Sequence, residues 1–176
     1  MRVLREMLAA RGYAFPQDAA GDFAAVRGDE VVLVLFRDKV GLSEMHSLVE
    51  KLKAEALRHC IVVTADKLWS SHASAKAAAS GLWIENFTRK QLLVNVSRMH
   101  MVPPHVLLTA EEATEFLASE GLVREQLPKI STEDPQARFL GARLDDVVKI
   151  FRPSETAGEI IVHRVVAVLP KPKKKQ

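Results

Sequence analysis

Two continuous apolar runs constrain the fold of this chain more than any other feature of its sequence. Residues 31–36 read VVLVLF and residues 60–64 read CIVVT, and both runs are rich in β-branched side chains. Such runs are typical of strands that are buried on both faces of a sheet. Between them, residues 42–56 carry apolar side chains at helical spacing. A strand, a helix and a second strand predict a βαβ unit with two parallel strands.

The rest of the first half continues this alternation of helices and strands. Residues 3–8 place their apolar side chains on one helical face, and the run at residues 82–87 predicts a third strand. A capping box at residues 88–91 predicts a short helix after that strand. We expect residues 94–101 to be extended. Residues 1–102 are therefore predicted to form an α/β domain, a βαβ-type sheet with flanking helices.

Two adjacent prolines, Pro103 and Pro104, interrupt this pattern and favour an extended, stiff joint. We therefore place a domain boundary between residues 102 and 103. After it, a capping box at residues 109–112 predicts a helix. An Asp-Pro pair at residues 134–135 predicts the start of a shorter helix. Residues 103–167 are expected to form a small α+β domain.

The last part of this domain is predicted to be a β-hairpin. Two apolar runs, at residues 147–151 and 160–166, have the composition of strands. Residues 152–158 read RPSETAG and are expected to form a turn-rich connection between them. Residues 168–176 form a lysine-rich basic tail, which fits either a nuclear-localisation signal or a solubilising end.

The charge and composition exclude several classes of protein. The net charge is only +3, and much of the excess lies in the tail, so the folded body is close to neutral and gives only weak electrostatic support for autonomous nucleic-acid binding. No apolar run approaches the roughly 18 residues that a membrane span needs, and the charges in residues 1–6 argue against a signal peptide. The single cysteine, Cys60, excludes an internal disulfide and favours a reducing, intracellular compartment.

Catalytic and metal-binding patterns are weak. The six histidines are scattered, with no HExxH pair, and no glycine-rich phosphate loop is present. Asp66 and Lys67 follow a predicted strand, which keeps a small metal-dependent nuclease open as an alternative. A free-standing DNA-binding protein is a second alternative. His59 and Cys60 could form a reactive dyad, although a buried structural cysteine is the other interpretation.

The second half carries a series of short motifs in a fixed order. The most specific is the heptapeptide RPSETAG at residues 152–158. The others are PHV at 104–106, TAEE at 109–112, QLPKI at 126–130, DP at 134–135, ARF at 137–139 and Arg164. In these motifs the second half resembles the small H polypeptide of archaeal RNA polymerase. It also resembles the matching C-terminal domain of the fifth-largest subunit that the eukaryotic nuclear RNA polymerases share.

The first half resembles the N-terminal jaw domain of the same eukaryotic subunit. The matching elements are RGY at residues 11–13, KVG at 39–41, CIVV at 60–63 and SAK at 74–76. The segment between Gly12 and Val31 is shorter than is usual in that family, His72-Ala73 replaces a Thr-Pro, and Asp145 stands where a glycine is common. These departures lead us to expect a divergent lineage, a protist or a large DNA virus.

The resemblance implies a noncatalytic polymerase subunit whose residues 1–102 form a jaw module and whose residues 103–167 form an assembly module. Its expected partners are the largest polymerase subunit, other small subunits and downstream duplex DNA, with no membrane. No cofactor is expected on this chain, since Mg²⁺ and Zn²⁺ would belong to other subunits. The implied location is the nucleus, or a viral factory or virion if the protein is viral.

Two sets of residues are candidates for these contacts. Arg152 and Glu155 can form directional charged contacts with another chain, although an internally satisfied turn is the alternative. Ser74, Ala75 and Lys76 are the DNA-proximal candidates, with a solvated lysine on an alanine-rich helix as the alternative. The full set of subunit-interface candidates is Arg138, Arg152, Pro153, Ser154, Glu155, Thr156 and Gly158.

Overall fold

The computed structural model describes residues 2–18, 21–65, 79–154, 156 and 158–169. The chain divides into two compact units, Met1–Val94 and Asn95–Gln176, and each is described by itself. The boundary expected between residues 102 and 103 stays a prediction, as do the jaw and assembly roles. Among the described helices, none combines the length and the apolar composition needed to cross a membrane.

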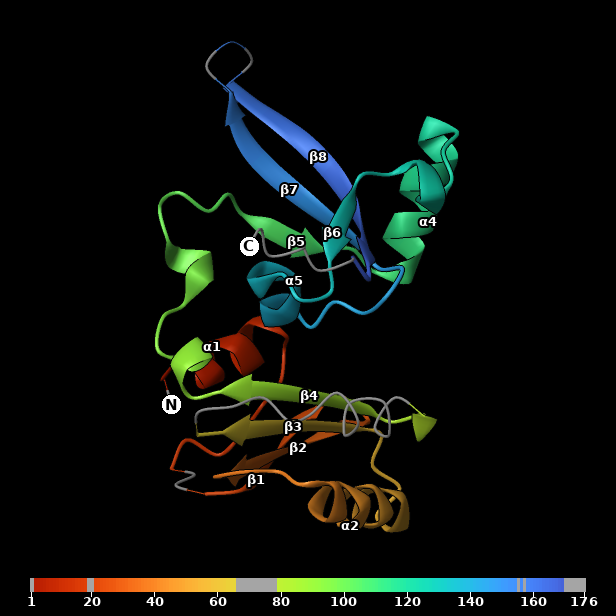
Figure 1. The fold of residues 1–176 in the computed structure, drawn as a ribbon. Coiled ribbons are helices and arrows are strands. Elements are labelled where there is room, and N and C mark those ends of the chain that lie inside the picture. Colours follow the sequence, from red (N-terminus) through yellow and green to blue (C-terminus); the bar gives the residue numbers. More distant parts are fainter. Residues whose placement is uncertain (1, 19–20, 66–78, 155, 157, 170–176) are drawn as a thin grey trace, which may run out of the picture. The chain divides into compact units, whose positions relative to one another are not determined.

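The first unit contains a four-stranded sheet in which the strands follow chain order (Figure 1). Strands β2, β3 and β4 are parallel, as the βαβ pattern predicts, and β1 is antiparallel to β2. The hairpin turn between β1 and β2 begins at Gly28, whose φ of +58° suits a two-residue turn with glycine first. The strands are β1 (Phe23–Arg27), β2 (Glu30–Arg37), β3 (His59–Thr64) and β4 (Trp83–Thr88).

Helices α1 (Arg2–Ala10) and α2 (Leu42–Ala54) lie on opposite sides of this sheet (Figure 1). The predicted apolar face of α1 is buried at Val3, Leu4, Met7 and Leu8. Both helices are therefore confirmed. The buried residues of α2 are Met45, Val49 and Leu52.

The predicted capping box after β4 is also confirmed, because Thr88 N–H donates to Gln91 Oε1 at 2.9 Å and Gln91 N–H donates to Thr88 Oγ1 at 3.3 Å. The helix that it begins is the short 3₁₀ helix η1 (Lys90–Leu92).

The second unit is built on a mixed four-stranded sheet with the order β5-β7-β8-β6. The long hairpin of β7 and β8 is antiparallel, β5 is antiparallel to β7, and β6 is parallel to β8. The predicted hairpin is thus confirmed, and its strands are longer than expected. The strands are β5 (His105–Leu107), β6 (Lys129–Ser131), β7 (Val147–Ser154) and β8 (Gly158–Ala167).

The helices of this unit begin and end where the capping signals predict. In α4 (Ala110–Glu120), Glu112 N–H donates to Thr109 Oγ1 at 3.2 Å and Thr109 N–H donates to Glu112 Oε2 at 2.7 Å. In α5 (Pro135–Leu140), Asp134 Oδ1 accepts hydrogen bonds from the first-turn amides. The two helices end at glycines with positive φ. The short 3₁₀ helix η3 (Arg124–Gln126) follows α4.

Two small cores cover the two faces of the sheet. Alternate residues of β7 contribute to them, because successive side chains of a strand point to opposite faces. The core on the α4 side contains Ala113, Leu127, Val147 and Val165. The core on the α5 side contains Ile130, Ala137, Val148, Ile150 and Val166.

Two local predictions are wrong. Residues 94–101 are not extended, because they contain the 3₁₀ helix η2 (Val96–Arg98), whose first turn is held by Asn95 Oδ1 accepting from Ser97 N–H at 3.0 Å. Residues 152–154 are not part of a turn either, because they continue β7 and pair with residues 158–160 of β8. Pro153 is compatible with this strand because proline is tolerated where a strand's N–H would face an edge.

Candidate subunit interface

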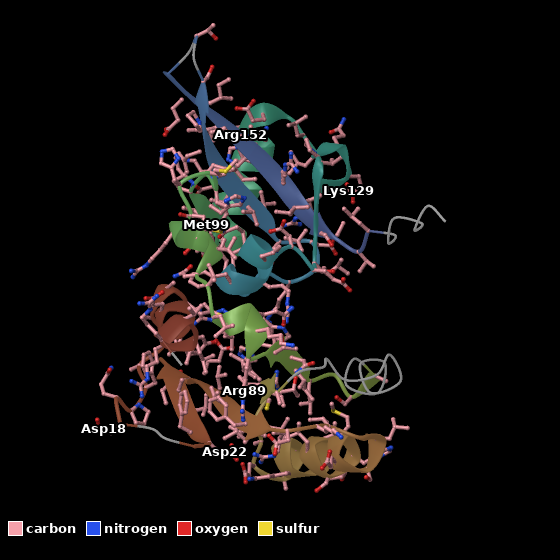
Figure 2. The ribbon with its side chains drawn as sticks, turned by 60° about the vertical axis from the view of Figure 1, so that its left-hand side comes forward. Asp18, Asp22, Arg89, Met99, Lys129 and Arg152 are labelled. Atoms are coloured by element: carbon pink, nitrogen blue, oxygen red, sulfur yellow. The ribbon has the colours of Figure 1, made fainter. Side chains whose placement is uncertain are left out.

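Most of the predicted interface residues lie together at the end of the β7–β8 hairpin. Arg152 pairs with Ile160, Pro153 with Glu159, and Ser154 with Gly158. Figure 2 shows Arg152 on the hairpin, near its end. Thr156 lies in the connection, where its Oγ1 is 3.4 Å from Ser154 Oγ. Glu155 lies outside the described residues.

Apolar and cationic side chains are exposed together at this hairpin end. Ile160 and Ile161 are 46% and 47% exposed, and they point to opposite faces because they are adjacent in the strand. Arg152 and Pro153 are also exposed. Exposed apolar side chains beside an arginine are typical of a protein–protein interface. The arrangement can therefore bury apolar surface and form a directional charged contact at the same place.

The structure places Arg138, the remaining interface candidate, on a different element. It belongs to α5, where its neighbour Ala137 packs in the core with Val148 and Ile150. Figure 1 shows α5 away from the end of the hairpin. Arg138 is half-buried. It is therefore separate from the group of candidates at the hairpin end.

The DNA-proximal candidates Ser74, Ala75 and Lys76 lie outside the described residues, as do Asp66 and Lys67 of the nuclease alternative. The strands on either side of this segment are described. β3 ends at Thr64 and β4 begins at Trp83.

A buried charged cluster in the first unit was missed by the sequence reasoning. Arg11 donates to both carboxylate oxygens of Glu85, at 2.6 and 2.9 Å, and His59 Nε2 lies 2.9 Å from Glu85 Oε1. Burial alone would raise the pKa of Glu85, but the Arg11 charge and the His59 hydrogen bond outweigh it and hold that pKa at about 2. The cluster is therefore centred on a buried ion pair that joins the residue after α1 to β4.

The same cluster extends to the aromatic residues around His59. The His59 ring stacks on Trp83 with centroids 3.7 Å apart, and Tyr13 OH lies 3.4 Å from His59 Nδ1. Burial, and then a hydrogen bond with Glu30, raise the pKa of Tyr13 to about 12. The RGY motif thus supplies Arg11 and Tyr13 to a buried structural network. In the sequence, the RGY motif itself was recognisable, but nothing there indicated that its side chains would contact Glu85 and His59.

Of the two interpretations of Cys60, the reactive dyad with His59 is wrong and the buried structural cysteine is confirmed. The two side chains lie on opposite faces of the sheet, because Cys60 packs with Leu35, Leu52 and Val62. Burial raises the pKa of the Cys60 thiol to about 12, which disfavours the thiolate. Within the described ranges, no group of three or more histidine, cysteine or acidic side chains is placed to hold a metal ion.

Comparison with known proteins identifies similar sequences over most of the chain. A family model described as RNA polymerase Rpb5, C-terminal domain, matches residues 94–166. Two proteins named DNA-directed RNA polymerases I, II, and III subunit RPABC1, from Caenorhabditis briggsae and Caenorhabditis elegans, are each 37% identical over 129 residues. These alignments cover 73% of this chain and 61% of each nematode protein.

A protein of the same name from Dictyostelium discoideum is 37% identical over 139 residues, which cover 76% of this chain and 71% of that protein. The chain therefore spans less than two thirds of the length of the nematode relatives that it matches.

Proposed function

Because the chain belongs to the RNA polymerase Rpb5 family, we propose that it is a noncatalytic subunit of a DNA-directed RNA polymerase and that it works in the nucleus. The resemblance in the sequence motifs is thereby confirmed at the level of the family. The names of the relatives support the assignment to a polymerase. In this function the chain acts by binding and positioning, and the chemistry of RNA synthesis belongs to other subunits.

The observation that carries this proposal is the exposed end of the β7–β8 hairpin. The hairpin lies inside the matched region 94–166, and its end presents Arg152, Ile160 and Ile161 to solvent. A unit this small buries only a limited core, and docking on a larger partner through such a surface would bury more apolar area. We propose that this end contacts the largest polymerase subunit.

The first unit has a second role in this proposal. Its resemblance to the jaw domain supports a position beside downstream duplex DNA, with residues 74–76 as the contact. Lys76 would bind phosphate without reading the base sequence. Two attachments, one to a subunit and one to DNA, would raise the effective concentration of the jaw at the duplex.

The experiment is affinity purification of the tagged chain under native conditions, followed by mass spectrometry. The large polymerase subunits are expected to co-purify with the wild-type chain. Replacing Arg152 and Glu155 together with alanine is expected to reduce their recovery about tenfold, because a charged hydrogen-bonded contact contributes about 1.5–3 kcal/mol.

The matched control also removes one positive and one negative charge, from an exposed pair on α2. Lys53 and Glu50 lie 3.9 Å apart, with side chains 52% and 77% exposed. Their double alanine variant should leave recovery unchanged. Equal recovery with the hairpin variant and this control would refute the interface assignment. Failure of the wild-type chain to recover any polymerase subunit would refute the function.

A further inference from the structure

One edge of strand β8 is open over most of its length. β8 runs from Gly158 to Ala167, and β7 pairs with it from Gly158 to Val165. On its other side, β6 pairs only with residues 165–167. Between Gly158 and Arg164, no described strand lies on that outer side. Figure 1 shows this part of the hairpin extending beyond β6.

The hydrogen bonds at the base of β8 show which backbone groups face the open edge. Val165 N–H donates outward to Pro128 O at 2.9 Å, whereas Val166 N–H donates to the β7 side, to Asp146 O at 2.8 Å. Backbone direction alternates along an antiparallel strand. Glu159, Ile161 and His163 therefore direct their N–H and C=O groups to the open edge.

Proline explains why the pairing of β6 with β8 begins only at Lys129. The next ladder bond would need an N–H from Pro128 to the carbonyl of His163, and proline has no N–H. The QLP motif thus ends the pairing and leaves the rest of β8 unpaired on this side.

The outer edge of β7, in contrast, is closed. β5 pairs with Val148, Lys149 and Ile150, and Phe151 N–H donates to Pro104 O at 3.0 Å. The next outward-facing position of β7 is Pro153, which cannot donate. Proline at an edge position is a common way to prevent pairing with another strand. One edge of the hairpin is therefore protected from strand addition, and the other is not.

The side chains around the open edge favour an apolar and acidic partner. Ile160 and Ile161 are about half exposed on opposite faces, so an added strand would cover apolar surface on both faces. Lys129, at the start of β6, is an exposed cation where the open edge begins, whereas the exposed Arg152 of β7 and Glu159 of β8 carry opposite charges at the hairpin end. Figure 2 shows Arg152 and Lys129 at these separate places.

We propose that the open edge of β8, at Glu159, Ile161 and His163, binds an extended segment of a neighbouring polymerase subunit as an added β-strand. This inference rests on the proposed function. The segment carries apolar residues that flank the two isoleucines and an acidic residue that faces Lys129. Main-chain hydrogen bonds supply affinity in this mode of recognition, and the side chains supply specificity.

Amide hydrogen exchange tests the proposal at single residues. In the isolated chain, the amides of Glu159, Ile161 and His163 should exchange quickly, whereas those of Ile160 and Val162, which face β7, should be protected. In the purified polymerase, the segment holding the three open-edge amides should become protected. Continued fast exchange there, in a polymerase that contains the chain, would overturn the edge proposal and leave the proposed function standing.

Two variants of Ile161 separate the backbone from the side chain. Ile161→Pro removes an outward N–H and keeps the bonds to β7, and Ile161→Ala removes the side chain but keeps the N–H. We expect the proline variant to lower recovery with the polymerase about tenfold below the alanine variant, from the loss of one to two hydrogen bonds. Val162→Pro, at an inward position, controls for damage to the hairpin and should lower the melting temperature of the isolated chain.

Three further results would also overturn the proposal. The first is equal recovery of the Ile161→Pro and Ile161→Ala variants. The second is protection of the Ile161 amide in the isolated chain that grows with concentration, which would assign the edge to a second copy of this chain. The third is a wild-type chain that recovers no polymerase subunit, which would refute the proposed function and this inference with it.

Discussion

The end of helix α2 provides a prediction with an unusual sign, because an alanine occupies a left-handed position there. Ala56 has a φ of +55°. Its N–H donates to Lys53 O at 3.1 Å, and the N–H of Leu57 donates to Leu52 O at 2.8 Å. This pair of bonds is the Schellman motif, in which glycine is the usual residue with positive φ. Ala56 is exposed, so its methyl group contributes little packing.

The magnitude follows from two opposing terms. A left-handed conformation costs an L-residue roughly 1–2 kcal/mol. Glycine loses more conformational entropy than alanine on folding, and this loss offsets about 0.5–1 kcal/mol of the relieved strain. The variant Ala56→Gly should therefore stabilise the protein by about 0.5–1 kcal/mol, and raise the melting temperature by about 2–3 °C for a chain of this size.

The assay is urea unfolding followed by circular dichroism. The matched control is Gly121→Ala at the end of α4, where the same two bonds occur, from Gly121 N–H to Ala118 O and from Leu122 N–H to Leu117 O. Gly121 has a φ of +64°, and a Cβ added there would meet no atom within 4 Å. This control should destabilise the protein by a similar amount. A lower stability for Ala56→Gly would refute the reasoning.

Three further predictions concern single residues. Glu85→Gln should lower the free energy of unfolding by about 3 kcal/mol, because Arg11 loses its buried partner. Folding lowers the pKa of Glu85 to about 2, so the ionised carboxylate stabilises the fold above about pH 5 and this stabilisation is lost as the pH falls toward 2. Urea unfolding measured across this pH range should show the loss in the wild-type chain and not in the variant. Asp145→Gly should stabilise the second unit by about 0.5 kcal/mol in urea unfolding, because Asp145 has a φ of +68°. Lys76→Glu should leave recovery with the polymerase unchanged and reduce the salt dependence of DNA retention by a slope of about 1; an unchanged slope would remove Lys76 from the DNA contact.

Much of the fold was predictable because its signals are local. The runs at residues 31–36 and 60–64, with a helix between them, sufficed for the parallel pair β2–β3. The caps at Thr109 and Asp134 were predictable for the same reason, since a capping side chain bonds to backbone two or three residues away. Asp145 is a related case, because the resemblance placed a glycine at a position that has positive φ in the structure.

Other features depend on contacts between distant residues and could not be predicted. Strand β1 reads FAAVR, a weak pattern that becomes a strand by pairing with β2. Arg11 and Glu85 are 74 residues apart in the sequence, and neither residue alone indicates a buried ion pair. Residues 152–154 look like a turn because of Pro153, and only the position of that proline at a strand edge makes it compatible with β7.

The central claim is that this chain is a stoichiometric subunit of an RNA polymerase. The most direct test is to purify the polymerase through a tag on its largest subunit and to measure the amount of this chain in the active fraction by quantitative mass spectrometry. A polymerase subunit should keep one fixed ratio to the largest subunit through every purification step. A chain that is absent from the active fraction and migrates at its own mass of 19.5 kDa would contradict this claim.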